Sequence, residues 1–166
     1  ELGGAFIAAG AESYKGKLRE LLAWYKKQMA DLGIEIHLNE EIKDVSEFAG
    51  RPVIVATGST ARVLKNVPRH EKMVEACEYL TGTEVGETVA VIGGGLTGCE
   101  IAYELALQGK KPIIVEMKDD LVSQKGVCLA NSSYLREWFK LHKIPVYLET
   151  TLKEVQDGKI LCAKGG

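Results

Sequence analysis

The sequence has few of the residues that usually carry acid-base catalysis, metal binding or disulfide bonds. It contains three histidines and four cysteines in 166 residues. The cysteines show neither close pairing nor the spacing of a zinc site, so we interpret them as reduced structural thiols. Each histidine stands without a matched nucleophile or metal partner. These residues are Cys77, Cys99, Cys128, Cys162, His37, His70 and His142.

Long apolar runs and an excess of one charge are absent too. No apolar stretch approaches the ~20 residues that a membrane-spanning helix needs. The formal net charge is -2, which gives no general attraction for nucleic acid or an anionic membrane. The hydrophobic content of 46% is ordinary for a chain with a core. We therefore expect a globular, cytoplasmic protein with no nucleic-acid or membrane partner.

The most informative segment, Thr88 to Glu116, has the pattern of a strand, a glycine-rich turn, a helix and a second strand. The apolar run Val89–Ile92 is typical of a parallel strand that is buried on both faces. Apolar residues then recur at helical spacing to about Leu107, and Gly109 is placed to end the helix. Pro112–Val115 forms the second strand. This pattern predicts an α/β fold with a Rossmann-like, doubly wound parallel sheet.

The turn of this unit has the spacing of a dinucleotide-binding fingerprint and consists of Gly93, Gly94, Gly95, Leu96, Thr97 and Gly98. Gly93 permits a tight reversal, and Gly95 has no Cβ to keep a pyrophosphate from the backbone. Gly98 lets the helix press against the strand. The unpaired amides at the helix N-terminus favour a phosphate. The turn therefore predicts dinucleotide binding, with a purely structural glycine turn as the alternative.

Glu116 ends the second strand, close to the ~20-residue separation at which an acid receives the ribose hydroxyls. A carboxylate binds a free 2′-hydroxyl and repels a 2′-phosphate, so NAD(H) is favoured over NADPH. Lys118 would weaken this preference if it contacts a phosphate, and Met117 between them is also an expected cofactor contact. The alternative for Glu116 is a solvated strand end.

A partial duplication indicates a second dinucleotide fold. Residues 34–45 align without gaps with residues 144–155, and amphipathic helices precede them at about 14–32 and 131–142. Each copy is expected to form a hairpin beside the main sheet, and the apolar stripes of both helices are expected to be core. Val53–Gly58 has the pattern of an apolar strand that ends in a small-residue turn.

The simplest account of the duplication is one dinucleotide fold nested inside another. Residues 1–60 would belong to a partial FAD-binding domain, residues 61–86 to a connector, and residues 87–166 to a Rossmann-like NAD(P)-binding domain truncated at its C-terminus. We expect the chain to be a fragment of a longer polypeptide in which a glycine-rich unit precedes Glu1.

With Leu2–Phe6, Val53–Gly58 and Gly93–Glu100 in place, the chain resembles the C-terminal flavoprotein portion of bacterial NADH:flavin oxidoreductases. More narrowly, it resembles the group that contains 2,4-dienoyl-CoA reductase and 2-enoate reductase, with a pyridine nucleotide-disulfide oxidoreductase-like fold. In that family this portion passes hydride from NAD(P)H to FAD, and an N-terminal barrel with FMN and an iron-sulfur cluster receives the electrons. The resemblance implies an oxidoreductase whose barrel partner is absent here, so the fragment alone is expected to be inactive.

The resemblance assigns the nicotinamide cofactor to Gly93, Gly95 and Gly98, and its ribose to Glu116. Glu100 matches a glutamate near the nicotinamide end in related reductases, with a helix-surface carboxylate as the alternative. The residues that match the FAD lining are Gly3, Gly4, Ala56, Thr57 and Gly58. No catalytic side chain is expected, because the cofactors carry the chemistry of hydride transfer.

Other functions share parts of this pattern. Disulfide reductases share the nested architecture, and in them a redox-active cysteine pair lies shortly after the double glycine. In this chain the first cysteine after Gly4 is Cys77, which argues against such a thiol relay. A non-catalytic NAD(H)-sensing module would keep the same turn. A methyltransferase also has a glycine-rich first turn, but the duplication and Ala56–Gly58 argue against it. The favoured function is therefore an NADH-dependent flavin oxidoreductase that acts on an enoate or enoyl-CoA.

Overall fold

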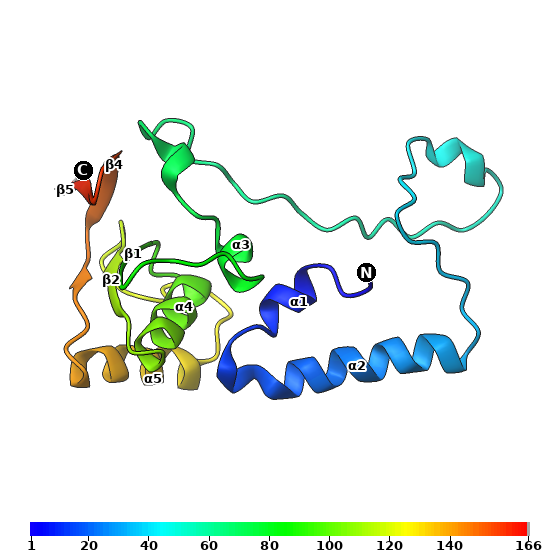
Figure 1. Ribbon diagram of the computed structural model, residues 1–166, viewed down its shortest axis with the longest axis horizontal. Helices are drawn as coiled ribbons and strands as arrows, with labels where there is room; N and C mark the ends of the chain where they lie inside the picture. The colour runs from blue at the N-terminus through cyan, green and yellow to red at the C-terminus, as the bar shows by residue number, and fades with distance from the viewer. Residues whose placement is uncertain (166) are drawn as a thin grey trace.

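The computed structural model describes residues 1–165, which form a packed α/β lobe and an arm that extends from it (Figure 1). The helices are α1 (Ala5–Ala9), α2 (Gly16–Asp31), α3 (Ala76–Leu80), α4 (Leu96–Leu107) and α5 (Leu129–Leu141). The strands are β1 (Thr88–Ile92), β2 (Lys111–Val115), β3 (Val146–Tyr147), β4 (Thr150–Gln156) and β5 (Lys159–Lys164). Short 3-10 helices lie at η1 (Ser13–Lys15), η2 (Val45–Phe48) and η3 (His70–Lys72).

A parallel sheet with the strand order β1-β2-β3 organises the lobe. In β1 and β2, Ile92 lies opposite Val115, and the ladder continues into the turn because the Gly93 amide donates to the Val115 carbonyl at 2.8 Å. Helix α4 connects these two strands and packs against both, and α5 packs against α4. The predicted Rossmann-like α/β fold is therefore confirmed, and α4 begins and ends where the apolar spacing placed it.

The hydrophobic core lies between α4, α5 and the sheet. Its most deeply buried large side chains are Leu105 on α4, Ile114 on β2 and Phe139 on α5. The connector also contributes, because Tyr79 and Val85 pack against this cluster. None of the helices within residues 1–165 combines the length and apolar character needed to cross a membrane.

The second copy of the duplication pairs differently from our prediction. Val146–Tyr147 joins the main sheet as a parallel neighbour of β2, with Ile114 opposite Val146. The antiparallel hairpin is instead β4 with β5, which are joined through Asp157 and Gly158. The hairpin predicted within residues 144–155 is therefore wrong, because its first strand pairs with β2 and its second pairs with a strand further along the chain.

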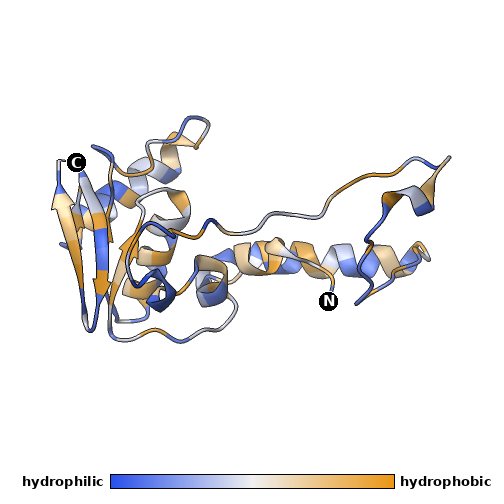
Figure 2. Ribbon diagram, turned by 90° about the horizontal axis from the view of Figure 1, so that it is seen from above, coloured by the Kyte–Doolittle hydropathy of each residue, from blue (hydrophilic) through white to orange (hydrophobic). Residues whose placement is uncertain are grey.

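The first copy of the duplication does not form the predicted strands. Residues 34–44 and 53–58 have no regular secondary structure, and they lie in the extended path between α2 and the lobe in Figure 1. Figure 2 shows an apolar stretch in this extended path. Ile54, which lies between two valines in the sequence, is 92% exposed. A strand needs a partner for its backbone groups, and within residues 1–165 none pairs with these segments.

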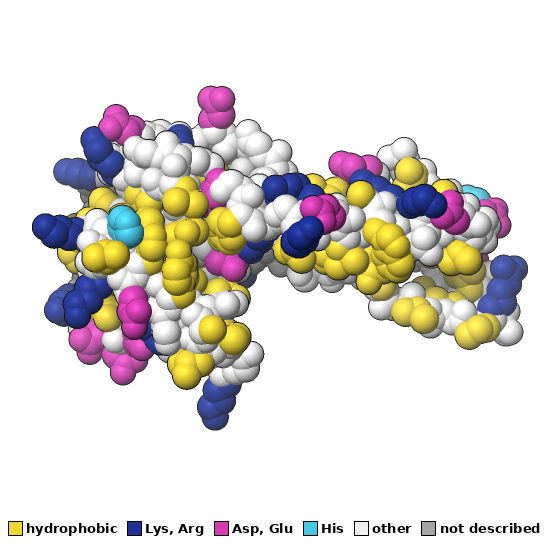
Figure 3. Space-filling view, turned by 90° about the horizontal axis from the view of Figure 1, so that it is seen from below, with side chains coloured by type: hydrophobic (Ala, Val, Ile, Leu, Met, Phe, Trp, Pro, Cys, Tyr) yellow, Lys and Arg dark blue, Asp and Glu magenta, His cyan; other side chains and the backbone are white. Residues whose placement is uncertain are grey.

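The apolar stripe of α2 is also less buried than expected. No residue of α2 is fully buried, and Trp24 is 52% exposed. Figure 3 shows hydrophobic side chains at the surface of the arm, where Leu21, Tyr25 and Leu32 are exposed. The prediction that this stripe is core is therefore wrong for this structure, since α2 is covered mainly by the short helix α1.

Candidate functional site

The glycine turn joins the end of β1 to the start of α4, and its tightest contact is at Gly98. A Cβ added to Gly98 would overlap the carbonyl oxygen of Gly93 and lie 3.1 Å from its carbonyl carbon. It would also lie 3.5 Å from the Val91 side chain on β1. The close approach of helix to strand that we predicted at Gly98 is therefore present.

The turn presents unpaired amides to a pocket. The first amide in α4 with an acceptor inside the helix is that of Cys99, which donates to the Gly95 carbonyl at 2.9 Å. The amides of Leu96, Thr97 and Gly98 precede it and therefore lack an intrahelical acceptor. Gly93, Gly95, Leu96, Thr97 and Gly98 line a pocket of about 680 Å³ whose other walls come from β1, the connector and the β4-β5 hairpin.

Glu116 lies at the end of β2 and is bound to the neighbouring backbone. Its carboxylate oxygens accept hydrogen bonds from the Gly94 amide at 2.6 Å and from the Lys118 amide at 2.7 Å. The residue is only 8% exposed, so the alternative of a solvated strand end is wrong. Each carboxylate oxygen has a second lone pair, which leaves Glu116 able to accept a further hydrogen bond. Met117 beside it is 70% exposed.

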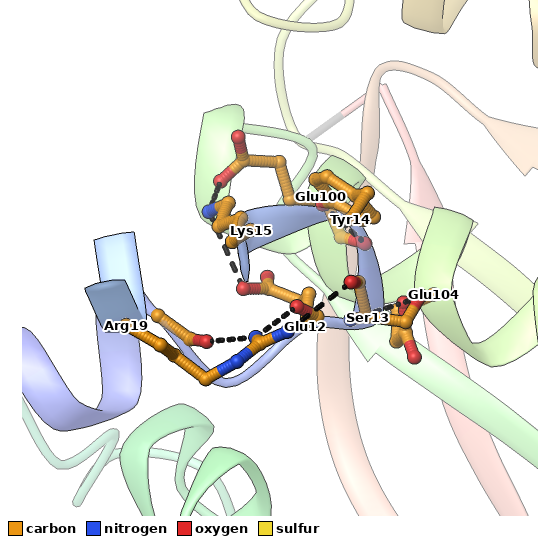
Figure 4. A network of polar contacts seen from close by, with 8 residues as sticks. Glu12, Ser13, Tyr14, Lys15, Arg19, Glu100 and Glu104 are labelled. Carbon is orange, nitrogen blue, oxygen red and sulfur yellow. Dashed lines mark hydrogen bonds and ion pairs between the residues drawn. The ribbon is translucent and has the colours of Figure 1, made fainter. Parts of the chain in front are cut away.

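Glu100 lies on a different face of α4, where it binds the N-terminal segment of the chain (Figure 4). Its carboxylate accepts a hydrogen bond from Lys15 Nζ at 2.7 Å, and the same ammonium lies 3.3 Å from the Glu12 carboxylate. Glu100 does not line the pocket at the glycine turn. The alternative of a helix-surface carboxylate describes its position best, with a specific cation as its partner.

Two further contacts fix the N-terminal segment to α4. The amide and hydroxyl of Ser13 both donate to one Glu104 oxygen, at 3.1 and 2.8 Å, and Gln108 donates to the other at 3.1 Å. Arg19 on α2 donates to the Gly10 carbonyl at 2.5 Å. This hydrogen bond joins the start of α2 to the segment that precedes Ser13. Sequence reasoning missed the contacts of Ser13 with Glu104 and of Lys15 with Glu100, because residues 91 and 85 positions apart carry no local pattern that joins them.

The Glu12 side chain is buried among these groups and is 2% exposed. Burial raises the pKa of its carboxyl, an effect that Lys15 opposes and Glu100 reinforces. The folded chain therefore binds more protons than the unfolded chain at pH values between the ordinary glutamate pKa and the raised one. Since a folded state that binds more protons loses stability as pH rises, stability falls through this window.

We expect Glu12→Gln to raise the free energy of unfolding by about 1 kcal/mol at pH 8, because it removes the buried charge. Below about pH 4 the gain should vanish, since Glu12 is then protonated in both states. Urea unfolding from about pH 3 to 8 measures the difference in the free energy of unfolding between the variant and the wild type. Glu20→Gln at an exposed position serves as the control. If the stability difference between Glu12→Gln and the wild type did not change with pH, the raised pKa assigned to Glu12 would be contradicted.

Comparisons with known proteins agree with this geometry. The profile described as pyridine nucleotide-disulphide oxidoreductase matches residues 45–165. The chain belongs to the pyridine nucleotide-disulphide oxidoreductase family. This result and the relatives described below confirm the family that the sequence resembled.

Two relatives of this pyridine nucleotide-disulphide oxidoreductase chain are bacterial reductases or oxidases. Cinnamate reductase from Clostridium sporogenes is 37% identical over 99% of this chain, which covers 25% of that protein. NADH oxidase from Thermoanaerobacter brockii is 33% identical over 72% of this chain, which covers 20% of that protein. A solved 2-naphthoyl-CoA reductase complex matches 99% of this chain and 25% of its own, with a TM-score of 0.82 at 22% identity, and so shares its fold. The chain thus spans about a quarter or less of the length of these proteins.

The cysteines of this family member give no sign of a redox pair. All four are free, and Cys99 is fully buried. Burial raises the pKa of the Cys99 thiol to about 12, despite its place in the first turn of α4. Its Sγ lies 3.3 Å from the Gly94 carbonyl oxygen, so Cys99 packs beneath the glycine turn. Among residues 1–165 no group of His, Cys, Asp and Glu is placed to hold a metal ion.

The residues expected to line FAD are not gathered into one site. Gly3 and Gly4 precede α1 at the start of the chain, whereas Ala56–Gly58 lies in the extended path that follows α2. A Cβ added to Gly4 or Gly58 would meet no atom within 4 Å, so neither lies against another segment. Because the five residues do not form a cradle here, we derive no step through FAD from them.

Proposed function

We propose that this chain binds NAD(H) at the glycine turn and forms the electron-input part of an NADH-dependent flavin oxidoreductase. The observation that carries the proposal is the position of Gly95. It lines the pocket beside the unpaired amides of α4, and the atoms nearest to where its Cβ would lie belong to the flexible side chain of Gln124. Backbone at a helix N-terminus that is covered only by the end of a long side chain suits a diphosphate, because that side chain has rotamers by which to move aside.

Each part of the site has a distinct role in this proposal. The amides of Leu96 and Thr97 would hold the diphosphate, and the spare lone pairs of Glu116 would accept the hydroxyls of the adenosine ribose. Gly94 keeps that carboxylate in place. Met117 and Lys118 flank the ribose position. NADH supplies the hydride when it is bound, while the protein provides its position and electrostatic surroundings.

We infer a larger reaction from the relatives. The name of cinnamate reductase supports an α,β-unsaturated acid, or a related enoyl thioester, as the final electron acceptor. Because Gly3, Gly4 and Ala56–Gly58 are not gathered into a site in this structure, the FAD that would accept electrons from NADH, and a barrel with FMN and an iron-sulfur cluster, would belong to the assembled longer protein. The length of the relatives leaves room for that barrel. The chain alone would then bind NADH without turnover.

A thermal-shift titration tests the nucleotide site directly. Ligand at 100 times its dissociation constant adds about 2.7 kcal/mol of stability, which corresponds to roughly 5–11 °C for a chain of this size. We expect NADH to give the largest shift, NADPH a smaller one and S-adenosylmethionine none. Equal shifts with NADH and NADPH would remove the selectivity assigned to Glu116, and no shift with either would overturn the proposed site.

A further inference from the structure

The loop between β2 and α5 packs directly over the glycine turn. Leu121 and Val122 are 4% and 3% exposed, and the Val122 amide donates to the Gly94 carbonyl at 2.7 Å. Val122 has a φ of 46°, in a region that β-branched residues rarely adopt. The buried side chains and this hydrogen bond hold the loop against the turn in spite of that strain.

Helix α5 fixes the same loop from the other side. Arg136 donates to the Leu121 carbonyl through Nε at 3.0 Å and Nη2 at 2.5 Å. Its guanidinium also bonds the Asp120 carboxylate at 2.9 to 3.0 Å. Residues 120–122 of the loop are therefore held over the turn, and residue 124 follows them closely in the chain.

Gln124 is the residue that this anchored loop places over the turn. Its carboxamide nitrogen lies where a Cβ on Gly95 would be, and its carboxamide carbon is 3.5 Å from that point. Gln124 lines the pocket together with Gly95 and Thr97. Its side chain is exposed and flexible, so the carboxamide is able to turn aside while its amino group stays within reach of the turn.

We propose that Gln124 is a cofactor-positioning residue whose carboxamide donates a hydrogen bond to the diphosphate of the bound nucleotide. This inference rests on the proposed NAD(H) site. The helix amides approach the diphosphate from the side of the turn, and Gln124 provides a donor from the opposite, loop side. The carboxamide carries no charge, so it adds a donor without repelling the phosphates. Asp119 and Asp120 precede it, but Arg136 binds Asp120 at the far side of the loop.

The test is isothermal titration of the wild type and of Gln124→Ala with NADH, ADP-ribose and adenosine. We expect Gln124→Ala to weaken NADH and ADP-ribose binding about tenfold, which is the effect of losing a hydrogen bond to a charged group. Adenosine binding should not change, because adenosine has no phosphate. Gln124→Glu should weaken both phosphate ligands further, since its carboxylate faces the diphosphate. Ser123→Ala, next to it and outside the pocket lining, should match the wild type.

The outcomes separate this inference from the proposed function. If the wild type does not bind NADH, the proposed function itself is wrong. If the wild type binds NADH and Gln124→Ala binds it as tightly or more tightly, only the role of Gln124 is overturned. An equal loss for adenosine would also overturn it, because the effect would not pass through the diphosphate. The unfolding temperature of each ligand-free variant is the control for folding. If it equals that of the ligand-free wild type, a loss of affinity is not caused by unfolding.

Discussion

Gly98→Ala is expected to lower the free energy of unfolding by about 3 kcal/mol or more and to abolish NADH binding. The added methyl group would overlap the Gly93 carbonyl oxygen, which is backbone and has no rotamer by which to move away. To remove this overlap, α4 must move away from β1. This movement opens the core around Leu105 and displaces the glycine turn. In an unobstructed helix the same change would stabilise by about 1 kcal/mol, so the sign of the effect is itself diagnostic.

Denaturant unfolding and NADH titration of Gly98→Ala measure the two effects together. Gly86→Ala is the matched control, because a Cβ at Gly86 meets nothing within 4 Å and the backbone there does not have a positive φ. We expect this control to stay within about 0.5 kcal/mol of the wild type. If Gly98→Ala were as stable as the wild type, α4 would not press against β1 as the structure has it.

Glu116→Ala is expected to cost about 2–4 kcal/mol of stability and to reduce NADH affinity roughly 10–100-fold. The variant leaves the buried amide of Gly94 and the partly buried amide of Lys118 without their acceptor. Affinity falls as well because the ribose loses its acceptor and the turn loses the contact that orders Gly94. Calorimetric titration at fixed ionic strength, beside denaturant unfolding, separates the two losses.

Glu116→Gln is the conservative companion, with the same size and no charge. The carboxamide oxygen of the introduced glutamine replaces one carboxylate oxygen as an acceptor, whereas its amino group faces the other backbone donor. Because one of the two hydrogen bonds is kept, the stability loss should be smaller than for alanine. The preference for NADH over NADPH should fall towards equality, because nothing then repels the 2′-phosphate. An unchanged ratio would show that another residue, such as Lys118, sets the preference.

The parts of the fold that follow local rules could be predicted from the sequence. The unbroken apolar run at Val89–Ile92, the helical spacing after Gly95 and the reversal at Gly109 each require only neighbouring residues, and these elements form as predicted. The glycine turn follows for the same reason, since the absence of a Cβ is a property of single positions. Gly98 then contacts Gly93, five residues away.

The parts that depend on distant partners could not be predicted. The apolar alternation in residues 34–45 and the apolar run in residues 53–58 indicate strands, but a strand exists only where another strand completes its hydrogen bonds. The Lys15–Glu100 pair and the place of Gln124 over Gly95 are likewise tertiary facts. A lone lysine or glutamine in a sequence carries no periodicity that indicates what it will meet.

Helix α4 is engaged at two places at once, because its first turn holds the glycines while Glu100 and Glu104 hold Lys15 and Ser13. Thermodynamic linkage then makes any influence mutual. Any factor by which a bound nucleotide strengthens the attachment of Ser13 and Lys15 to α4 is the same factor by which that attachment strengthens nucleotide binding. The twelve-residue helix α4 is therefore shared by both sets of contacts, and any coupling through it would change nucleotide affinity when Lys15 or Ser13 is substituted, although neither lines the pocket at the glycine turn.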